Sequence, residues 1–373
     1  MLKSGKAAGS GDPVSIDGSI LEGGGQIIRI SAALACLLRQ PVALHSIRAK
    51  RSKPGLRAQH LTGLGLVMEM SQGNLVGGGV GATEVQLHPG QLQGGRFQAD
   101  PGTAGSVALL IQVSLPCALF APRPTRLQLR GGTNADMAPP VDYIQQVFCP
   151  ISKRFGVDCD VSIVKRGFFP RGGGIVDVNV QPVAQLSAVE MLDPGHVVRI
   201  TGTAICAGEL PRGYGNDIAK ACQRLLLNRH KELVADVKID IAGEYIQRDQ
   251  ATATGSCVLL VAETSTGCLL AGSGLGSRGK GPRDIAADAV DMLTNNLQHG
   301  ACVDEHLQDQ LIILMALAKG TSRIRTGPLT LHTQTAIELC KNLLGVNFDV
   351  TPVDGVADAN VVSCQGLEFS RST

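Results

Sequence analysis

Three consecutive glycines stand between an acidic and a basic side chain near the start of the sequence. The run reads Glu22-Gly-Gly-Gly-Gln26, with Arg29 one helical turn later. Free backbone N–H groups at a glycine-rich helix start, together with the positive end of the helix dipole, favour a bound phosphate. Glu22 adds a carboxylate that can contact a divalent metal. Glycine runs also form plain tight turns, and the charged neighbours are what favours a phosphate site here.

A cluster of basic side chains directly precedes the second predicted helix. Guanidinium and ammonium groups gathered in one loop suit a triphosphate or an RNA end. A charge run is more often a solvated face, and this one also matches a weak nuclear-import pattern. Its place beside the glycine run favours a phosphate site. The basic and neighbouring polar residues are Arg48, Lys50, Arg51, Lys53, Arg57, Gln59 and His60.

A histidine stands at the predicted start of the last long helix. His332 follows Pro328-Leu-Thr-Leu, and the dipole of a helix favours the neutral imidazole at this end. The lone pair of a neutral imidazole can attack phosphorus. Histidines at helix starts are more often plain caps, so both interpretations stay open at this point. No H-x-x-x-H pair and no C-x-x-C pair occurs in the sequence, which argues against the common zinc motifs.

Two further glycine-rich segments are ambiguous by themselves. The string Arg166-Gly-Phe-Phe-Pro-Arg-Gly-Gly-Gly-Ile-Val176 contains a triple glycine that a β-bulge or a tight crossing also explains. The segment Gly272–Gly281 matches both G-x-G-x-x-G and G-x-x-x-x-G-K, but Gly281 stands where a P-loop needs Ser or Thr. No second parallel strand ending in an acidic residue follows, as a dinucleotide fold requires. We therefore reject both nucleotide-binding motifs in this segment.

The elements that must position these residues recur along the chain. Phe155–Val161 (FGVDCDV) is repeated as Leu344–Val350 (LGVNFDV), each time after a helix-like run and at the start of a strand. Upstream of both, a strand leads through a Gly/Pro loop into a helix, and a more diverged copy opens the chain. Strand, helix, strand and helix followed by further strands, three times over, predict an α/β (α+β) protein of three packed units.

The repeat breaks between the second and third copies, where a smaller α/β domain is inserted. The predicted limits are a flexible tail at 1–14, units at 15–94 and 95–184, the insert at 185–277, and the third unit at 278–373.

The composition favours a folded chain without membrane spans. Of its 373 residues, 44% are hydrophobic and only 18% are charged, which excludes wholesale disorder. No run of about 18 apolar residues occurs, so neither a membrane span nor a signal peptide is expected. The net charge of +2 restricts any polyanion site to a local patch, and the 3% of aromatic residues disfavours extended base-stacking platforms. Eleven cysteines, several in apolar runs, are typical of reduced intracellular thiols.

Taken together, these segments resemble the RNA 3′-terminal phosphate cyclase family. The resemblance extends from about Ser15 to Ser363. That family is built from three βαβαββ units with a smaller domain inserted between the second and the third, as the repeat pattern also predicts. The segments that carry the resemblance are Arg166–Val176, Glu22–Gln26, the loop Arg48–Gly55, Gln59-His60 and Asp309-Gln310.

The resemblance implies an ATP-dependent enzyme of the ligase class that acts on RNA 3′-phosphate ends. A histidine takes AMP from ATP and passes it to the RNA 3′-phosphate, and the ribose 2′-hydroxyl then closes a 2′,3′-cyclic phosphate. Mg²⁺, or Mn²⁺, assists at the phosphates. The implied partners are ATP and RNA with a 3′-phosphate, with no membrane. A monomer and a homodimer both remain open, and the implied location is intracellular, in a eukaryote the nucleus.

The resemblance also assigns residues to roles. His332 matches the adenylated nucleophile and Glu22 matches a metal-contacting carboxylate. His306 replaces the Tyr that bacterial relatives carry three residues before the Asp-Gln pair, and a histidine can also stack on adenine. The residues matched to the phosphates are Arg29, Arg48, Arg51, Gln59 and His60. Those matched to the nucleotide pocket are Gln112, Pro139, Asp309 and Gln310.

Two other classes of protein share parts of this pattern. A ribosome-biogenesis branch of the same family keeps the fold, lacks the nucleophilic histidine and acts as a binding protein. His332 and the intact Glu22–Arg29 segment argue against that branch. Enolpyruvyl transferases use similar repeats and basic loops, but they have six repeats in two lobes and form no adduct with ATP.

Overall fold

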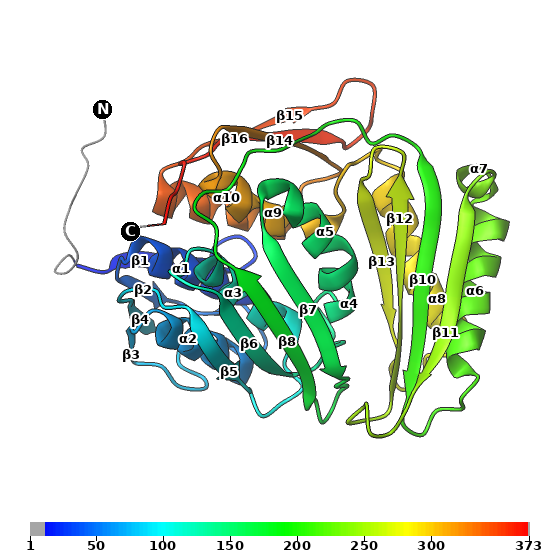
Figure 1. Ribbon diagram of the computed structural model, residues 1–373, viewed down its shortest axis with the longest axis horizontal. Coiled ribbons are helices and arrows are strands. Elements are labelled where there is room, and N and C mark those ends of the chain that lie inside the picture. The colour runs from blue at the N-terminus through cyan, green and yellow to red at the C-terminus, as the bar shows by residue number, and fades with distance from the viewer. Residues whose placement is uncertain (1–11, 372–373) are drawn as a thin grey trace.

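The computed structural model describes residues 12–371 and folds into four-stranded sheets covered by helices (Figure 1). This confirms the predicted α/β class. Most of the predicted tail, residues 1–11, lies outside the described residues. Among the described residues, none of the helices combines the length and the apolar character that crossing a bilayer requires.

The first sheet has the strand order β1-β2-β4-β3. β1 and β2 are parallel, with Val14 opposite Val42, whereas β4 is antiparallel to both β2 and β3. Each helix follows a parallel strand, so both helices start at the same edge of the sheet. The strands are β1 (Val14–Asp17), β2 (Val42–His45), β3 (Asn74–Val76) and β4 (Val85–His88), and the helices are α1 (Gly25–Leu38) and α2 (Ala58–Met70).

The second sheet repeats this arrangement in the order β5-β6-β8-β7. Its second helix is a continuous helical run in four pieces, one of which is a π-turn. Pro150 has no N–H to donate to a carbonyl four residues earlier, which accounts for the wider turn before it. The strands are β5 (Gly95–Ala99), β6 (Thr125–Gly131), β7 (Asp158–Lys165) and β8 (Gly174–Gln181), and the helical elements are α3 (Val107–Leu119), α4 (Val141–Tyr143), η1 (Ile144–Phe148), α5 (Cys149–Ser152) and η2 (Lys153–Phe155).

The third sheet, β9-β14-β16-β15, draws its strands from distant parts of the sequence. β9 is parallel to β14, with Glu190 opposite Arg323, although more than one hundred residues separate them. The elements are β9 (Glu190–Met191), α9 (Glu305–Leu317), β14 (Thr321–Thr326), α10 (Leu331–Leu344), β15 (Phe348–Pro352) and β16 (Asn360–Gln365).

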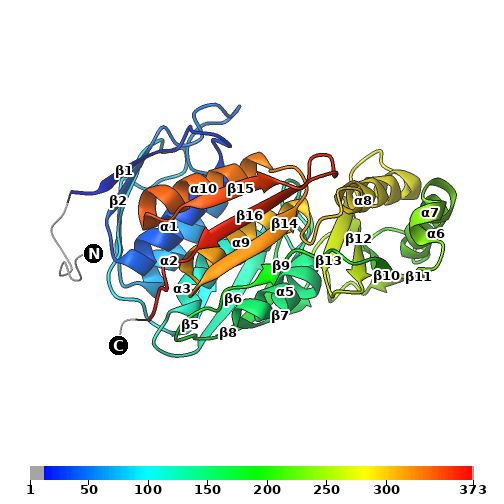
Figure 2. The same cartoon turned by 90° about the horizontal axis from the view of Figure 1, so that it is seen from above.

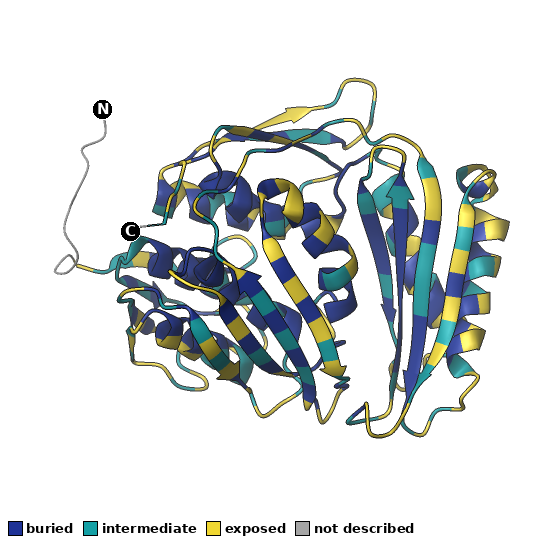
Figure 3. Ribbon diagram, viewed as in Figure 1, coloured by how far each residue is buried: buried dark blue, intermediate teal, exposed yellow. Residues whose placement is uncertain are grey.

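A separate sheet of order β11-β10-β12-β13 lies to one side (Figure 1). α6 and α8 pack against each other and against this sheet, and the outer face of α6 is exposed (Figure 3). The predicted limits of the units and the insert stay a prediction. The elements are β10 (Val197–Ala207), α6 (Tyr214–Arg229), α7 (Lys231–Val234), β11 (Lys238–Ile246), β12 (Gly255–Thr264), β13 (Leu269–Leu275) and α8 (Pro282–Leu297).

The helices of the first three sheets gather between the sheets (Figure 2). α1 packs against α2, α3 and α10, and α10 packs against α9. α1 is therefore apolar on nearly all sides, and residues such as Ile27, Leu34 and Cys36 are fully buried. This central packing brings helix ends from distant parts of the sequence together.

Candidate active site

The N-terminal ends of α1, α2, α3 and α10 meet at one place. The backbone N–H of Glu22 donates to Thr335 of α10 (3.2 Å), and that of Ser106, the cap of α3, donates to Gln59 of α2 (3.0 Å). A Cβ placed on Gly25 would lie 2.6 Å from Nε2 of His60. Each helix end contributes partial positive charge, so the meeting point favours an anion.

His332 is an exposed residue in the first turn of α10, and hydrogen bonds hold the start of that helix in place. Thr330 caps the helix by accepting the N–H of Thr333 (3.0 Å). The buried Gln308 accepts the hydroxyl of Thr333 (3.0 Å) and donates to the carbonyl of Pro328 (3.2 Å). The loop before His332 is therefore held on α9.

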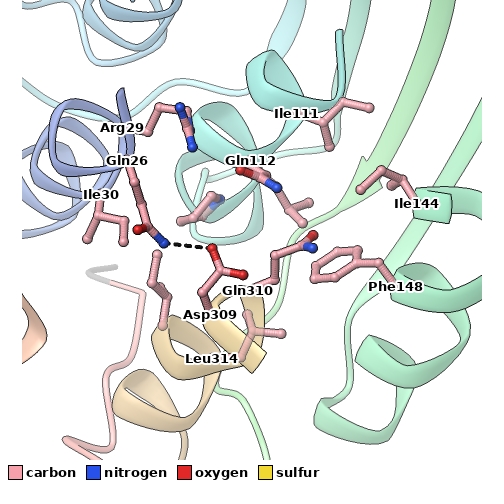
Figure 4. Close-up of a pocket in the computed structure, with 13 residues that line it drawn as sticks. Gln26, Arg29, Ile30, Ile111, Gln112, Ile144, Phe148, Asp309, Gln310 and Leu314 are labelled. Atoms are coloured by element: carbon pink, nitrogen blue, oxygen red, sulfur yellow. Dashed lines mark hydrogen bonds between the residues drawn. The ribbon is translucent and has the colours of Figure 1, made fainter. Parts of the chain in front are cut away.

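Gln26 connects His332 to Asp309 across three helices. Its Nε2 donates to Oδ2 of Asp309 (2.6 Å), as the dashed line in Figure 4 shows, and its Oε1 lies 2.8 Å from Nδ1 of His332. Because the Oε1 atom of Gln26 can only accept, Nδ1 must carry the imidazole proton. This tautomer follows from the hydrogen-bond network. Nε2 of His332 therefore keeps a free lone pair.

Asp309 anchors this chain of hydrogen bonds from the middle of α9. Burial raises the pKa of its carboxyl, while the nearby His332, His306 and Arg29 act in the opposite direction. A carboxylate at this end stabilises positive charge that develops on the imidazole of His332. The family resemblance matched Asp309 to the nucleotide pocket and gave Gln26 no role, although Gln26 belongs to the glycine-run motif.

Arg29 is the basic group that faces the meeting point from α1. It lines two adjoining cavities, and within residues 12–371 its guanidinium has no hydrogen bond or ion pair. Burial lowers the pKa of Arg29, and the carboxylates of Asp309 and Glu22 oppose that shift. An arginine without a protein partner at such a place suits a phosphate.

His60 is a buried neutral histidine beside Arg29. Burial, followed by the charges of Arg29, Arg48 and Arg57, lowers its pKa to about 3. Its Nδ1 accepts the backbone N–H of Arg57 (3.1 Å), so the proton of the neutral ring is on Nε2. That N–H faces Gly25 at the start of α1. His60 therefore presents an uncharged donor to an anion at the helix ends.

The buried neutral state of His60 predicts a pH-dependent stability. The unfolded chain takes up a proton near the ordinary histidine pKa, whereas the folded protein does not until about pH 3. Stability contributed by the neutral ring is therefore complete above that ordinary pKa and falls as the pH is lowered. Between pH 7 and pH 5 we expect wild type to lose about 2 kcal/mol more unfolding free energy than His60→Gln. Urea titrations at the two pH values measure this difference.

His196→Gln, at an exposed histidine, is the matched control and should keep the wild-type pH dependence. If His60→Gln lost as much unfolding free energy as wild type between pH 7 and pH 5, His60 would not be held neutral by the fold.

Glu22 and Arg51 form an ion pair at the edge of the meeting point. Arg51 also donates to the backbone carbonyl of Glu22 (3.0 Å). The second carboxylate oxygen of Glu22 is buried and has no hydrogen-bond partner within the described residues. A buried unpartnered carboxylate oxygen is a ligand atom that Mg²⁺ prefers.

Two of the residues matched to the phosphates hold the local structure. Arg48 donates to the carbonyls of Lys53 (2.8 Å) and Gly55 (2.9 Å), which closes the basic loop on itself. Gln59 uses its carbonyl oxygen for Ser106 and lines the smaller cavity beside Arg29. Arg48 therefore stabilises the basic loop, whereas Gln59 both holds the start of α3 and lines the smaller cavity.

The larger cavity has a polar side and an apolar side (Figure 4). On α9, Gln310 donates to the carbonyl of His306 (2.6 Å), and its own carbonyl oxygen is buried without a partner among residues 12–371. The cavity therefore offers one unused acceptor beside an apolar wall. The polar side comprises Gln26, Arg29, Gln112, Asp309 and Gln310, and the apolar side includes Ile111, Ile144, Phe148 and Leu314.

Pro139 and His306, which the resemblance matched to the nucleotide pocket and to stacking on adenine, line neither of the two cavities. Pro139 is buried in the loop before α4. The ring of His306 stands edge to face against Tyr143, with centroids 5.7 Å apart. Tyr143 in turn donates to Oδ1 of the buried Asp304 (2.6 Å), which caps α9. Asp304 directly precedes an apolar helix, which is a capping signal that can be seen in the sequence.

Comparison with known proteins places the chain in a family. The family model described as RNA 3′-terminal phosphate cyclase matches residues 20–350. A probable RNA 3′-terminal phosphate cyclase of Dictyostelium discoideum is 41% identical over 96% of this chain and 83% of its own length. The RNA 3′-terminal phosphate cyclases of Drosophila melanogaster (39%; 95% of this chain and 96% of theirs) and Pyrobaculum aerophilum (37%; 96% and 99%) are similar throughout. The resemblance drawn from the sequence motifs is confirmed: the chain belongs to the RNA 3′-terminal phosphate cyclase family.

Proposed function

We propose that this protein uses ATP to convert an RNA 3′-phosphate into a 2′,3′-cyclic phosphate. The observation that carries the proposal is the chain of hydrogen bonds from Asp309 through Gln26 to His332. This chain leaves a lone pair on the exposed imidazole of His332. The imidazole lies close to the helix ends and to Arg29, which has no ion pair among the described residues and suits a phosphate. The names of the relatives support the same reaction.

In the first step Nε2 of His332 attacks the α-phosphorus of ATP. A P–N bond forms, the bond from the α-phosphorus to the bridging oxygen breaks, and pyrophosphate leaves with that electron pair. The imidazole becomes positively charged, and Gln26 and Asp309 stabilise this charge through the proton on Nδ1. Arg29 and the N–H of His60 face the phosphates and stabilise their negative charge.

In the next two steps AMP is transferred from the histidine to the RNA 3′-phosphate and is then released when the cyclic phosphate forms. An oxygen of the RNA 3′-phosphate attacks the same phosphorus, the P–N bond breaks, and Nε2 of His332 regains its lone pair. The ribose 2′-oxygen then attacks the RNA phosphorus, its proton passes to solvent, and AMP leaves. Because the 2′-hydroxyl supplies the attacking oxygen, the last sugar of the substrate must be ribose.

The larger cavity suits the nucleoside of ATP. Its apolar wall, with Ile144 and Phe148, can cover a flat base, and the unpartnered oxygen of Gln310 can accept from an amino group. Adenine carries such an amino group beside its ring. We therefore propose that the base of ATP lies in this cavity, with Gln112 at its edge.

Glu22 would hold the divalent metal. Within residues 12–371 no cluster of three or more metal-ligating side chains occurs, so one carboxylate would be joined by phosphate oxygens and water, as Mg²⁺ commonly is. The bound metal would neutralise charge on the pyrophosphate leaving group. Arg51 holds the other oxygen of Glu22 and so fixes the direction in which the free oxygen points.

Replacing Glu22 with glutamine should weaken the binding of Mg²⁺ during adenylation. Because the amide carries no negative charge, we expect the Mg²⁺ concentration for half-maximal adenylation to rise about tenfold or more. Titration of Mg²⁺ at saturating ATP measures this shift. Glu84→Gln, at an exposed residue, is the control and should titrate like wild type. The same midpoint in Glu22→Gln and wild type would remove Glu22 from the metal site.

The proposed function is tested with an RNA that carries a labelled 3′-phosphate. Incubation with Mg²⁺ and ATP should make the label resistant to phosphatase, because a cyclic diester has no terminal phosphate to remove. An RNA with a 2′-deoxy terminal sugar should stop at the adenylated RNA. If the protein is folded and neither the cyclic end nor a protein–AMP adduct forms, the proposal fails and a binding role within the family becomes the better explanation.

A further inference from the structure

The turn between β7 and β8 is clamped between two parts of the fold. On one side the N–H of Arg166 donates to Gln250 (2.8 Å), and Thr252 donates through its N–H to Arg166 (2.9 Å) and through its hydroxyl to Gly173 (2.9 Å). Figure 1 shows this end of β7 beside the neighbouring sheet. On the other side the N–H of Thr133 donates to Gly167 (2.9 Å). Backbone contacts thus fix the turn from both sides.

Glycine is required at two positions of this turn, because the neighbouring backbone leaves no room for a Cβ. Gly172 has φ +63°, and a Cβ there would collide with the backbone of Thr103. A Cβ on Gly167 would collide with the backbone of Gly131. The string Arg166–Val176 is therefore a rigid junction, not a loop that wraps a phosphate by itself.

Two neighbouring phenylalanines of the turn have opposite environments. Phe168 is 2% exposed and packs with Ile205, Ala251 and Cys257. Phe169 is 79% exposed, and among the described residues no other Phe or Tyr side chain is exposed. Arg171, two residues on, is also exposed and has no ion pair within residues 12–371. The rigid turn thus presents one aromatic ring and one guanidinium to solvent.

The turn lies at the edge of the sheet where the proposed active site begins. β7 is parallel to β6, because both are antiparallel to β8. It therefore ends at the edge from which α3 and α4 start. Gly172 packs on Thr103, and the loop that contains Thr103 ends at Ser106, which donates to Gln59. One loop thus separates the turn from the cavity shared by Gln59, His60 and Arg29.

We propose that this turn is a contact surface for the RNA strand just upstream of the reacting 3′-phosphate. Phe169 stacks on an unpaired base, and Arg171 pairs with a backbone phosphate. Proteins read single-stranded RNA in this way, because every base has a face that stacks on an aromatic ring and every linkage carries a charge. The inference rests on the proposed function, which brings an RNA 3′-end to the site.

The test separates RNA binding from formation of the AMP adduct, which needs no RNA. Phe169→Ala should weaken binding of a short oligouridylate 3′-phosphate about tenfold or more, while Phe169→Tyr restores it. Both variants should form the AMP adduct at the wild-type rate. Uridine 3′-phosphate has no upstream nucleotide, so its binding should be unchanged in both. Fluorescence anisotropy for the oligomer and competition for the mononucleotide measure these affinities.

The arginine is tested through salt dependence. Removing one phosphate contact lowers the slope of log affinity against log salt by about 0.7 for a single strand, so Arg171→Ala should show a smaller slope than wild type. Arg126→Ala, at an exposed arginine on β6, should keep the wild-type slope.

Several outcomes overturn the proposal. Oligomer binding by Phe169→Ala at the wild-type affinity removes the stacking contact. An equal loss for oligomer and mononucleotide, or a loss of the AMP adduct, means that Phe169 acts through the fold. If wild type forms the adduct but binds no oligomer, the surface is not for RNA and the adenylation chemistry still holds, whereas wild type that does neither contradicts the proposed function itself.

Discussion

Replacing His332 with alanine should abolish the covalent AMP adduct, with a loss of about 10⁴-fold or more in the rate of adenylation. No other group in the described site offers an unshared, correctly placed lone pair, since Nδ1 of His60 already accepts a backbone N–H. His332 is exposed in the first turn of α10, so its removal leaves no cavity in the core. Incubation with ATP labelled at the α-phosphate, followed by denaturation, measures the adduct.

The control for this prediction is His196→Ala, another exposed histidine, in the loop directly before β10 of the separate sheet. It should label like wild type, and both variants should unfold at the wild-type temperature. Acid lability of the label would identify a phosphoramidate. Label retained in His332→Ala would contradict the mechanism, because the AMP would then be carried by a different residue.

Replacing Gln26 with methionine should slow adenylation by about 10²-fold or more, with little change in the KM for ATP. Methionine has a similar volume but cannot accept from Nδ1 of His332. The imidazole then loses both its fixed tautomer and its link to the carboxylate of Asp309. Because Gln26 hydrogen-bonds the attacking histidine, the effect should fall mainly on kcat, and its place in the lining of the larger cavity should change KM by less. Rapid-quench measurement of adduct formation separates the two constants.

The position of AMP on the ring gives a readout that a structural defect would not change. Wild type should carry AMP on Nε2 only, whereas Gln26→Met should also form the Nδ1 isomer, and phosphorus NMR of the denatured adduct distinguishes the two. Gln128→Met is the control, because it removes a similar amide-to-carboxylate bond, to Asp177 (3.2 Å), in the second sheet. A wild-type rate in Gln26→Met would mean that the hydrogen bond does not position His332.

Local patterns along the chain determined much of the fold and of the site. The α/β class followed from alternating strands and helices, because each element has its own hydrophobic period. The glycine run at Glu22–Gln26 and the position of His332 at a helix start are also local features. Both features depend on residue types within a few positions of each other, so they can be predicted from the sequence alone. The family followed from the same segments.

Packing between distant segments decided the rest. Gln26 and His332 are 306 positions apart, and Gln26 and Asp309 are 283 apart, so only the contacts of α1 with α10 and of α10 with α9 bring them together. Burial and the charges of Arg29, Arg48 and Arg57 keep His60 neutral, and the approach of Arg29 comes from the packing of α1 on α2. Likewise, the string Arg166–Val176 is a rigid junction because parts of the fold that are distant in sequence hydrogen-bond to it from both sides. The amino-acid sequence specifies which donors, acceptors and charges are available, but which donor meets which acceptor depends on how the helices pack.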